Sequence, residues 1–358
     1  MNEQQIRNFN HDLLDWFHSN GRHLPWRETD NPYYIWVSEV MLQQTQVNTV
    51  IPYYMRFIRK FPTPAALADA PEQDVLKCWE GLGYYSRARH LQQGVREVVE
   101  KYDGQLPDSK ETLLSISGIG PYTASALLSM AYDEPEPAID GNLMRVLSRV
   151  FLIDDDIAKQ KTRRKFEDLA SSLITETDPG AFNQALMDIG AMICKPKHAD
   201  CPNCPLRRHC LASEEGVQLE YPVKSGNAKP RPLHYAVLLI RDDDGRYLIE
   251  KRPDKGLLAG FWQFPMILLD EYEKAGQRHD YISERYGCEM APVHTTFTYT
   301  HRFSHLIWHL TLLDGRTHQK PISEKQRLVA VADFDAYPFP VPHQKVIEWI
   351  KNNRQNHT

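Results

Sequence analysis

The sequence has no run of about 18 apolar residues, so a transmembrane helix is not expected. Its N-terminal stretch lacks a basic segment followed by an apolar one, so a cleaved secretory signal is not expected either. No internal repeat or low-complexity tract is recognised. Cysteine is scarce, with six among 358 residues, which excludes a disulfide scaffold and favours a reducing, cytoplasmic location.

An excess of basic residues is also missing. The chain has 42 Lys and Arg against 47 Asp and Glu, a net charge of −5. Residues 1–225 carry 24 basic and 31 acidic side chains, and residues 226–358 carry 18 and 16. Neither half has the basic character expected of a nucleic-acid binder. Such a function would therefore have to use local clusters such as Lys195/Lys197 and Arg207/Arg208.

The length predicts two domains. Helical spacing dominates residues 1–211 and predicts an all-α domain over 1–220. Residues 221–232, rich in proline and polar residues, are predicted to be a linker to a small α+β domain at 233–358. Helices are expected at 35–50, 52–57, 72–80, 86–101, 110–116, 121–131, 142–151, 162–174, 181–193, 274–286 and 346–352. Strands are expected at 234–241, 247–251, 293–299 and 306–313.

Four of the six cysteines crowd into 17 residues, separated by six, two and five residues: Cys194, Cys201, Cys204 and Cys210. Four thiolates at this density predict a soft metal centre. Zinc ribbons usually present two C-x2-C pairs, whereas this stretch has one, so the spacing favours a [4Fe–4S] cluster. Cys78 and Cys288 stand apart and are expected to be core residues.

The segment 113–126 predicts a short helix, a glycine hairpin and a second helix. Gly118 and Gly120 allow backbone amides to approach a ligand, and Pro121 suits the first position of the second helix. Amides at such a helix start can bind a phosphate, which would make the segment a clamp on the DNA backbone. On its own, a tight structural turn is the commoner explanation of this pattern.

Two carboxylates are candidates for acid–base work. Glu39 is isolated among apolar helical neighbours, so its pKa should rise towards that of a general acid. Asp140 precedes Gly141 and an apolar helix. Taken separately, each is more simply explained as a helix-start residue or cap. As a pair flanking a sugar, they could cleave a glycosidic bond.

In the order Glu39, hairpin, Asp140, cysteines, the N-terminal half resembles the endonuclease III superfamily of DNA glycosylases. Within it, the chain resembles the adenine DNA glycosylases of the MutY family. The matching stretches are LPWR (24–27), VSEVMLQQTQV (37–47), GLGYYSRAR (81–89), GIGPYTASA (118–126), IDGN (139–142) and the cysteine loop. The resemblance implies a helix-hairpin-helix domain with a [4Fe–4S] cluster on the four cysteines.

The same resemblance implies hydrolysis of the N-glycosidic bond of adenine mispaired with 8-oxoguanine or guanine. Glu39 would protonate the adenine and Asp140 would stabilise the oxocarbenium ion. Bifunctional relatives carry a lysine where this chain has Tyr122, and some MutY relatives carry one at Met144, so water is the implied nucleophile.

Further roles are implied by position. Tyr122 and Asn142 would orient the sugar and carboxylates. DNA contacts are implied for Arg27 and Gln184 at the adenine, for Gln44, Thr45 and Tyr84 where the base leaves the duplex, and for Gly118 and Gly120 at the backbone. Arg27 and Tyr84 are equally compatible with packing roles.

The C-terminal half resembles the Nudix-like recognition domain of MutY proteins. The stretch at 268–279 lacks the R-E-x-x-E-E pattern of Nudix hydrolases, so binding without nucleotide hydrolysis is implied. Residues 301–305, His-Arg-Phe-Ser-His, match the family's loop that senses 8-oxoguanine, through Phe303, Ser304 and His305. Without the N-terminal half, an exposed strand end would be the simpler reading.

The implied partner is double-stranded DNA carrying A:8-oxoguanine or A:G mispairs. The implied protein is a monomer in the bacterial cytoplasm, associated with the nucleoid when engaged, and not with membranes. Three alternatives stay open: a related Fe–S glycosylase or lyase with another base choice, a noncatalytic Fe–S protein that binds DNA or senses redox state, and a nucleotide pyrophosphatase.

Overall fold

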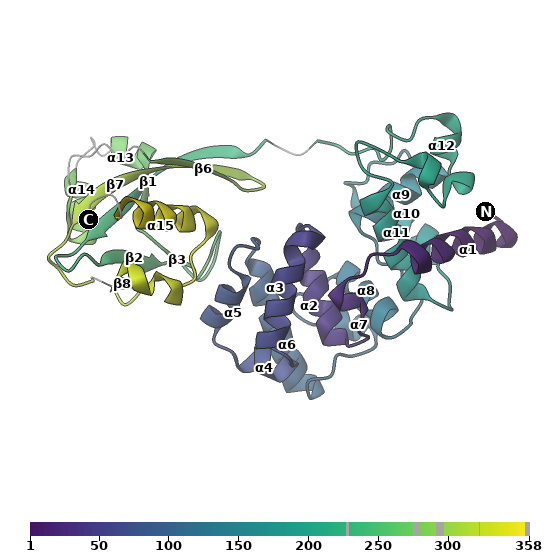
Figure 1. Ribbon diagram of the computed structural model, residues 1–358, viewed down its shortest axis with the longest axis horizontal. Helices are drawn as coiled ribbons and strands as arrows, with labels where there is room; N and C mark the ends of the chain where they lie inside the picture. The colour runs from purple at the N-terminus through teal and green to yellow at the C-terminus, as the bar shows by residue number, and fades with distance from the viewer. Residues whose placement is uncertain (227–228, 275–278, 291–296, 322, 355–358) are drawn as a thin grey trace. The chain divides into compact units, whose positions relative to one another are not determined.

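The structure, a computed structural model, describes residues 1–226, 229–274, 279–290, 297–321 and 323–354 (Figure 1). Its contacts divide the chain into two compact units. The first unit comprises Met1–Ala70 and His90–Gly226, and the second comprises Pro71–Arg89 and Asn227–Thr358. The first unit is helical and the second is built on a mixed sheet, which confirms the predicted fold class. No helix in the described ranges is long and apolar enough to cross a membrane.

The helices of the first unit follow the predicted order. They are α1 (Glu3–Asn20), α2 (Pro32–Leu42), α3 (Val47–Lys60), α4 (Pro64–Asp69), α6 (Ser86–Tyr102, whose first turn lies in the second unit), α7 (Lys110–Leu114), α8 (Pro121–Ala131), α9 (Gly141–Phe151), α10 (Gln160–Ser171), α11 (Pro179–Met192) and α12 (Leu211–Glu215). Short 3₁₀ turns occur at Pro25–Arg27, Cys201–Asn203 and Arg207–His209. Side chains of Asn31, Thr63, Ser109, Asp140 and Asp178 cap the helices that follow them.

The single helix expected over residues 35–50 is interrupted. α2 ends at Leu42 and α3 begins at Val47. Between them Gln44 has a φ of 59°, a left-handed conformation that cannot continue a right-handed helix. Pro52 lies inside α3 and does not start a separate segment.

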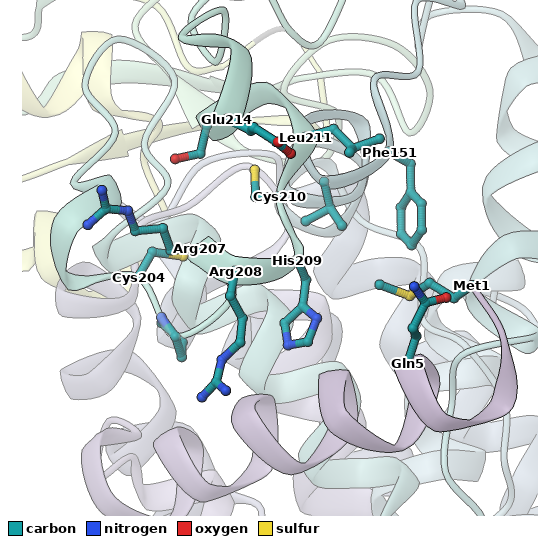
Figure 2. Close-up of a pocket in the computed structure, with 13 residues that line it drawn as sticks. Met1, Gln5, Phe151, Cys204, Arg207, Arg208, His209, Cys210, Leu211 and Glu214 are labelled. Atoms are coloured by element: carbon teal, nitrogen blue, oxygen red, sulfur yellow. The ribbon is translucent and has the colours of Figure 1, made fainter.

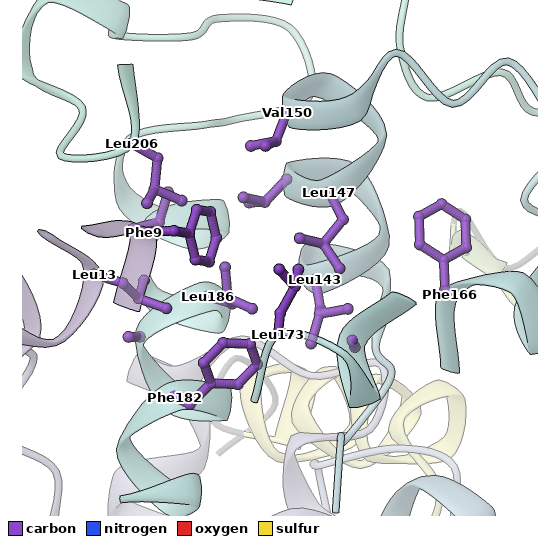
Figure 3. Close-up of a cluster of buried hydrophobic side chains, with 14 of the residues drawn as sticks. Phe9, Leu13, Leu143, Leu147, Val150, Phe166, Leu173, Phe182, Leu186 and Leu206 are labelled. Carbon is purple, nitrogen blue, oxygen red and sulfur yellow. The ribbon is translucent and has the colours of Figure 1, made fainter. Parts of the chain in front are cut away.

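A hydrophobic core joins the start of the chain to its helices after residue 139 (Figure 3). Phe9 of α1, Leu143 and Leu147 of α9, and Phe182 of α11 are fully buried in it. α9 is strongly amphipathic, since one face of the helix packs here. Leu206, in the cysteine loop, packs onto the same core and anchors that loop.

The second unit contains a sheet with the strand order β3-β2-β1-β7-β5; β4 also pairs with β1, β6 with β7 and β8 with β2. The strands are β1 (Arg231–Arg241), β2 (Tyr247–Lys251), β3 (Trp262–Gln263), β4 (Met266–Leu268), β5 (Glu289–Met290), β6 (Thr298–Arg302), β7 (Leu306–Arg316) and β8 (Gln326–Val329). The helices are α5 (Glu72–Trp79), α13 (Leu269–Lys274), α14 (His279–Tyr286) and α15 (Val341–Arg354), with a 3₁₀ segment at Val331–Ala336.

β1 and β7 form the centre of this sheet and pair in parallel, from Arg231 opposite Leu306 to Arg241 opposite Arg316. Residues 236–240 of β1 are all buried, which is typical of a strand covered on both faces. The strands predicted at 234–241, 247–251 and 306–313 are confirmed. Part of the strand expected at 293–299 lies outside the described residues, and β6 begins at Thr298.

Candidate active site

A cavity of the first unit collects side chains from α2, α8, α9, α11 and the segments beside α2. Its lining includes eight of the predicted site residues: Arg27, Glu39, Gln44, Thr45, Tyr122, Asp140, Asn142 and Gln184. They come from positions up to 157 residues apart, between Arg27 and Gln184. The fold therefore gathers the predicted acid Glu39, its predicted partners and the predicted base contacts around one space.

Glu39 lies on α2 with 4% of its surface exposed. The Tyr122 hydroxyl donates a hydrogen bond to Glu39 Oε2 at 2.5 Å. Burial raises the pKa of Glu39 to about 7; the Tyr122 hydrogen bond and nearby Arg27 lower it, and Asp140 raises it. A carboxyl group with this pKa is partly protonated near neutral pH, as a general acid requires.

Asp140 is held differently, as the N-cap of α9. Its Oδ1 accepts the Leu143 amide at 2.7 Å, and its Oδ2 accepts Asn142 Nδ2 at 2.8 Å. Burial raises the pKa of Asp140, and these hydrogen bonds oppose the rise because they favour the ionised form. Two carboxyl groups of one cavity thus have environments suited to different roles, the pattern that separates an acid from an ionised partner.

Arg145 holds Asn142 in place beside Asp140. Its Nη2 donates to Asn142 Oδ1 at 2.7 Å and its Nε donates to the Cys194 carbonyl at 2.8 Å. The guanidinium therefore links the residue that orients Asp140 to the first residue of the cysteine loop.

Asp188 was not identified from the sequence, although it is completely buried beside the cavity. It binds two arginines. Arg27 donates to it through Nη1 at 2.8 Å and Nη2 at 3.0 Å, and Arg22 donates through Nε at 2.8 Å. Two guanidinium groups on one carboxylate hold Arg27 in a defined orientation and leave one excess positive charge near Glu39 and Asp140. The only signal in the sequence was an acidic residue in an apolar helix, four residues after Gln184.

The glycine hairpin between α7 and α8 lies apart from this cavity. Gly118 has a φ of 83°, and a β-carbon there would meet the His90 backbone at 3.0 Å, so only glycine fits without strain. Gly120 is the N-cap of α8, and a β-carbon on it would meet nothing within 4 Å. The start of α8 is thus open to an approaching group.

The four predicted ligand cysteines line one small cavity together with Arg149. Arg149 Nη1 donates to Cys194 Sγ at 3.1 Å. In the described part of the chain, no group of three or more His, Cys, Asp or Glu side chains is drawn together closely enough to hold a single metal ion.

Cys204 and Cys210 also line a wider pocket, together with Arg207, Arg208 and His209 of the same loop (Figure 2). Asp12 of α1 fastens this loop, because its carboxylate lies 3.0 Å from Arg208 Nε and 2.7 Å from His209 Nε2.

In the second unit, a pocket brings Tyr84 together with Phe303, Ser304 and His305. Tyr84 has a φ of 49° and 48% of its surface exposed. Non-glycine residues rarely adopt such a conformation, and it often marks functional sites. Gln44, in the first unit, shares this feature.

Two family models match the chain. Residues 37–172 match the HhH-GPD superfamily base excision DNA repair protein, and residues 236–349 match a NUDIX domain. The adenine DNA glycosylase of Arabidopsis thaliana is 37% identical over 78% of this chain and 51% of that protein. That of Rattus norvegicus is 36% identical over 80% and 65%, respectively.

The adenine DNA glycosylase of Buchnera aphidicola subsp. Acyrthosiphon pisum is 32% identical, over 95% of this chain and 97% of that protein. The chain thus spans between about half and two thirds of the length of the plant and rat relatives, and nearly all of the Buchnera relative.

Among solved structures, a thermostable thymine-DNA glycosylase aligns with a TM-score of 0.53 and 26% identity, covering 59% of this chain and 98% of that one. A non-covalent endonuclease III–DNA complex aligns with a TM-score of 0.51 and 23% identity, covering 61% and 99%. At 23% identity, the likeness to the endonuclease III complex is evidence for a shared fold and for nothing further.

The raised pKa of Glu39 predicts a pH-dependent cost in stability. Folded Glu39 holds its proton up to about pH 7, compared with 4.5 for an ordinary Glu. The stability that this proton contributes is present below about pH 4.5 and is lost as the pH rises through about 7. Urea unfolding of Glu39→Gln and wild type should therefore diverge across this window, with the variant gaining up to about 3 kcal/mol. A stability difference that stays constant with pH would contradict the assignment.

Proposed function

This chain belongs to the adenine DNA glycosylase family, and on that premise we propose that it hydrolyses the N-glycosidic bond of adenine mispaired with 8-oxoguanine or guanine in double-stranded DNA. The observation that carries the proposal is the buried Glu39, hydrogen-bonded to Tyr122, in the same cavity as Asp140. Paired carboxyl groups with different environments suit cleavage of a glycosidic bond, which needs an acid and a stabiliser of positive charge.

The adenine leaves the base stack and enters the cavity. Glu39 transfers its proton to a ring nitrogen of the adenine while the bond to the sugar C1′ breaks. Ionised Asp140 stabilises the oxocarbenium ion, and Asn142 keeps that carboxylate oriented through the hydrogen bond to Oδ2. Water then bonds to C1′ and gives its proton to the Glu39 carboxylate, which restores the acid.

The surrounding residues recognise the substrate in this proposal. Arg27, oriented by Asp188, and Gln184 contact the adenine. Gln44 and Thr45 of the first unit contact the DNA where the base leaves the duplex, and Tyr84 of the second unit is a further DNA contact. The open start of α8 beyond Gly118 and Gly120 binds a backbone phosphate.

The proposed enzyme is monofunctional: it cleaves the glycosidic bond and does not cleave the DNA strand. We propose that it acts as a monomer. A lyase needs an amine that forms a Schiff base with the sugar. Tyr122 stands where bifunctional relatives carry that lysine, and Tyr122 is already committed to Glu39. Met144 likewise offers no amine.

The four cysteines fit a [4Fe–4S] cluster better than a single zinc ion. Zinc ribbons usually present two C-x2-C pairs, whereas Cys201 and Cys204 form the single such pair among these four cysteines. Cys194, Cys201, Cys204 and Cys210 line one cavity, and the Arg149 guanidinium, 3.1 Å from Cys194 Sγ, would offset the negative charge of a bound cluster. When bound, the cluster would cross-link the loop that presents Lys195, Lys197, Arg207 and Arg208 to DNA phosphates.

The second unit is proposed to read the lesion without hydrolysing nucleotides. Ser304 and His305 are exposed at its pocket and can donate or accept hydrogen bonds at a base edge. Phe303 packs behind them against Trp308, with 4.9 Å between ring centroids.

The decisive assay uses duplexes with adenine opposite 8-oxoguanine, adenine opposite guanine, or an oxidised pyrimidine, followed by alkali. Wild type should release adenine from the first two and leave the third intact. Glu39→Gln should keep mismatch binding and lose excision by about 10²–10⁴-fold or more, because the proton donor is gone. Single-turnover excision by the variant within tenfold of wild type would refute the role of Glu39.

Cys204→Ser should remove iron and the visible absorbance of the cluster, and weaken DNA binding through the basic loop. Cys288→Ser, at a cysteine buried in the second unit, serves as the matched control and should keep both. Iron analysis and DNA titration at fixed salt measure the outcome. Zinc in place of about four irons in wild type would reject the cluster.

Ser304→Ala combined with His305→Ala should reduce the preference for 8-oxoguanine over guanine, because a lost base contact costs about 1–3 kcal/mol of discrimination. Thr298→Ala, exposed at the start of β6 and outside the pocket, is the control. The measurement is the ratio of adenine excision rates on the two duplexes under limiting enzyme. An unchanged ratio in the double variant would assign the second unit another task.

A further inference from the structure

Two of the segments that line the pocket of the second unit are the loop of residues 256–259 and the end of β6 with the loop after it, residues 301–305. They are far apart in the sequence, yet lesion reading requires them to keep a constant relative position. We propose that Arg252, which does not itself line the pocket, is the positioning residue that holds both loops and thereby sets the discrimination between 8-oxoguanine and guanine. This inference rests on the proposed function of the pocket.

The first loop has an irregular backbone that needs support from outside. Gly256, Leu258 and Gly260 have φ values of 96°, 56° and 68°. Arg252 Nε donates to the Leu257 carbonyl at 3.0 Å, and the Arg252 backbone N–H donates to the Phe261 carbonyl at 2.8 Å. Arg252 therefore binds the loop at its middle and at its end.

The second loop is reached through a stack of side chains. The Arg252 guanidinium carbon lies 5.6 Å from the centroid of the Trp308 ring. Trp308 is buried and packs edge-on against Phe303, at 4.9 Å and an interplanar angle of 67°. Phe303 in turn contacts His301 with centroids 4.5 Å apart. A shift of Arg252 would thus be transmitted to the residue beside Ser304.

Arg252 is itself held in one orientation. Its Nη1 donates to Gln263 Oε1 at 2.5 Å, and Gln263 Nε2 donates to Glu250 Oε1 at 2.9 Å. The side chain thus binds a carbonyl, an amide and an aromatic face at once. A planar guanidinium can satisfy these three directions, whereas a lysine ammonium is a point charge without the fork or the stacking plane.

The test compares Arg252→Lys with Arg241→Lys in the full-length protein. Arg241 is a matched control, since its guanidinium lies 5.9 Å from the Tyr247 ring in the same sheet and outside the pocket. Arg252→Lys should lower the ratio of single-turnover excision rates, 8-oxoguanine over guanine, by about 3- to 10-fold. The rate opposite guanine should stay within about twofold, and the control should change neither rate.

Hydrogen–deuterium exchange supplies a readout that does not require activity. Arg252→Lys should accelerate exchange in both 256–260 and 301–305, and Arg241→Lys in neither. If Arg252→Lys does not fold, Trp308→Phe keeps the arginine, weakens the stack and should accelerate exchange in 301–305 alone.

The outcomes separate the two proposals. If wild type itself makes no distinction between the duplexes, lesion reading by this pocket fails, and exchange alone decides whether Arg252 holds the loops. If hydrogen–deuterium exchange in either loop is the same in Arg252→Lys as in wild type, the positioning role of Arg252 is overturned. An unchanged rate ratio in a folded variant, where wild type discriminates, overturns its effect on specificity.

Discussion

Glu39 is buried because nearly the whole of α2 is buried, and the proposed chemistry of the first unit depends on this burial. Nearly all of α2, from Tyr33 and Ile35 to Met41, is inaccessible to solvent, since the helix packs against α3 and α8. Ionising a carboxyl group on such a helix costs free energy, because water cannot solvate the charge. The contact with α8 also supplies Tyr122, so the same packing desolvates the Glu39 carboxyl group and provides its hydrogen-bond donor.

Local signals in the sequence predicted the parts of the fold that local interactions decide. The start of α8 was readable because Gly120 and Pro121 suit an N-cap and a first helical position, and the observed bounds agree with the predicted ones. The break after α2 was missed because neither Gln43 nor Gln44 is a typical helix terminator, and the left-handed conformation of Gln44 is imposed by its surroundings. The strands β3 and β5 were missed because two residues carry no periodicity.

Residues whose importance comes from partners distant in the sequence were beyond such reasoning. Asp188 is 161 residues from Arg27, and no spacing rule connects an acidic residue of α11 with a 3₁₀ turn near the start of the chain. Arg252 meets Trp308 across the sheet in the same way. By contrast, Glu39, Asp140 and the cysteines stood in recognisable motifs, and the cavity lining includes both carboxylates. Their chemical roles remain predictions for the assays above.

The discontinuous composition of the second unit imposes an order on its assembly during synthesis. Segment Pro71–Arg89 is grouped with residues that begin at Asn227, so it waits for roughly 140 further residues. At about 5–20 residues per second, the ribosome needs roughly 7–28 s to make them. Throughout that interval Tyr85, buried in the finished protein, lacks Phe261, whose ring centroid lies 4.2 Å from that of Tyr85. The nascent chain therefore carries an aromatic segment that chaperones can recognise until the sheet is complete.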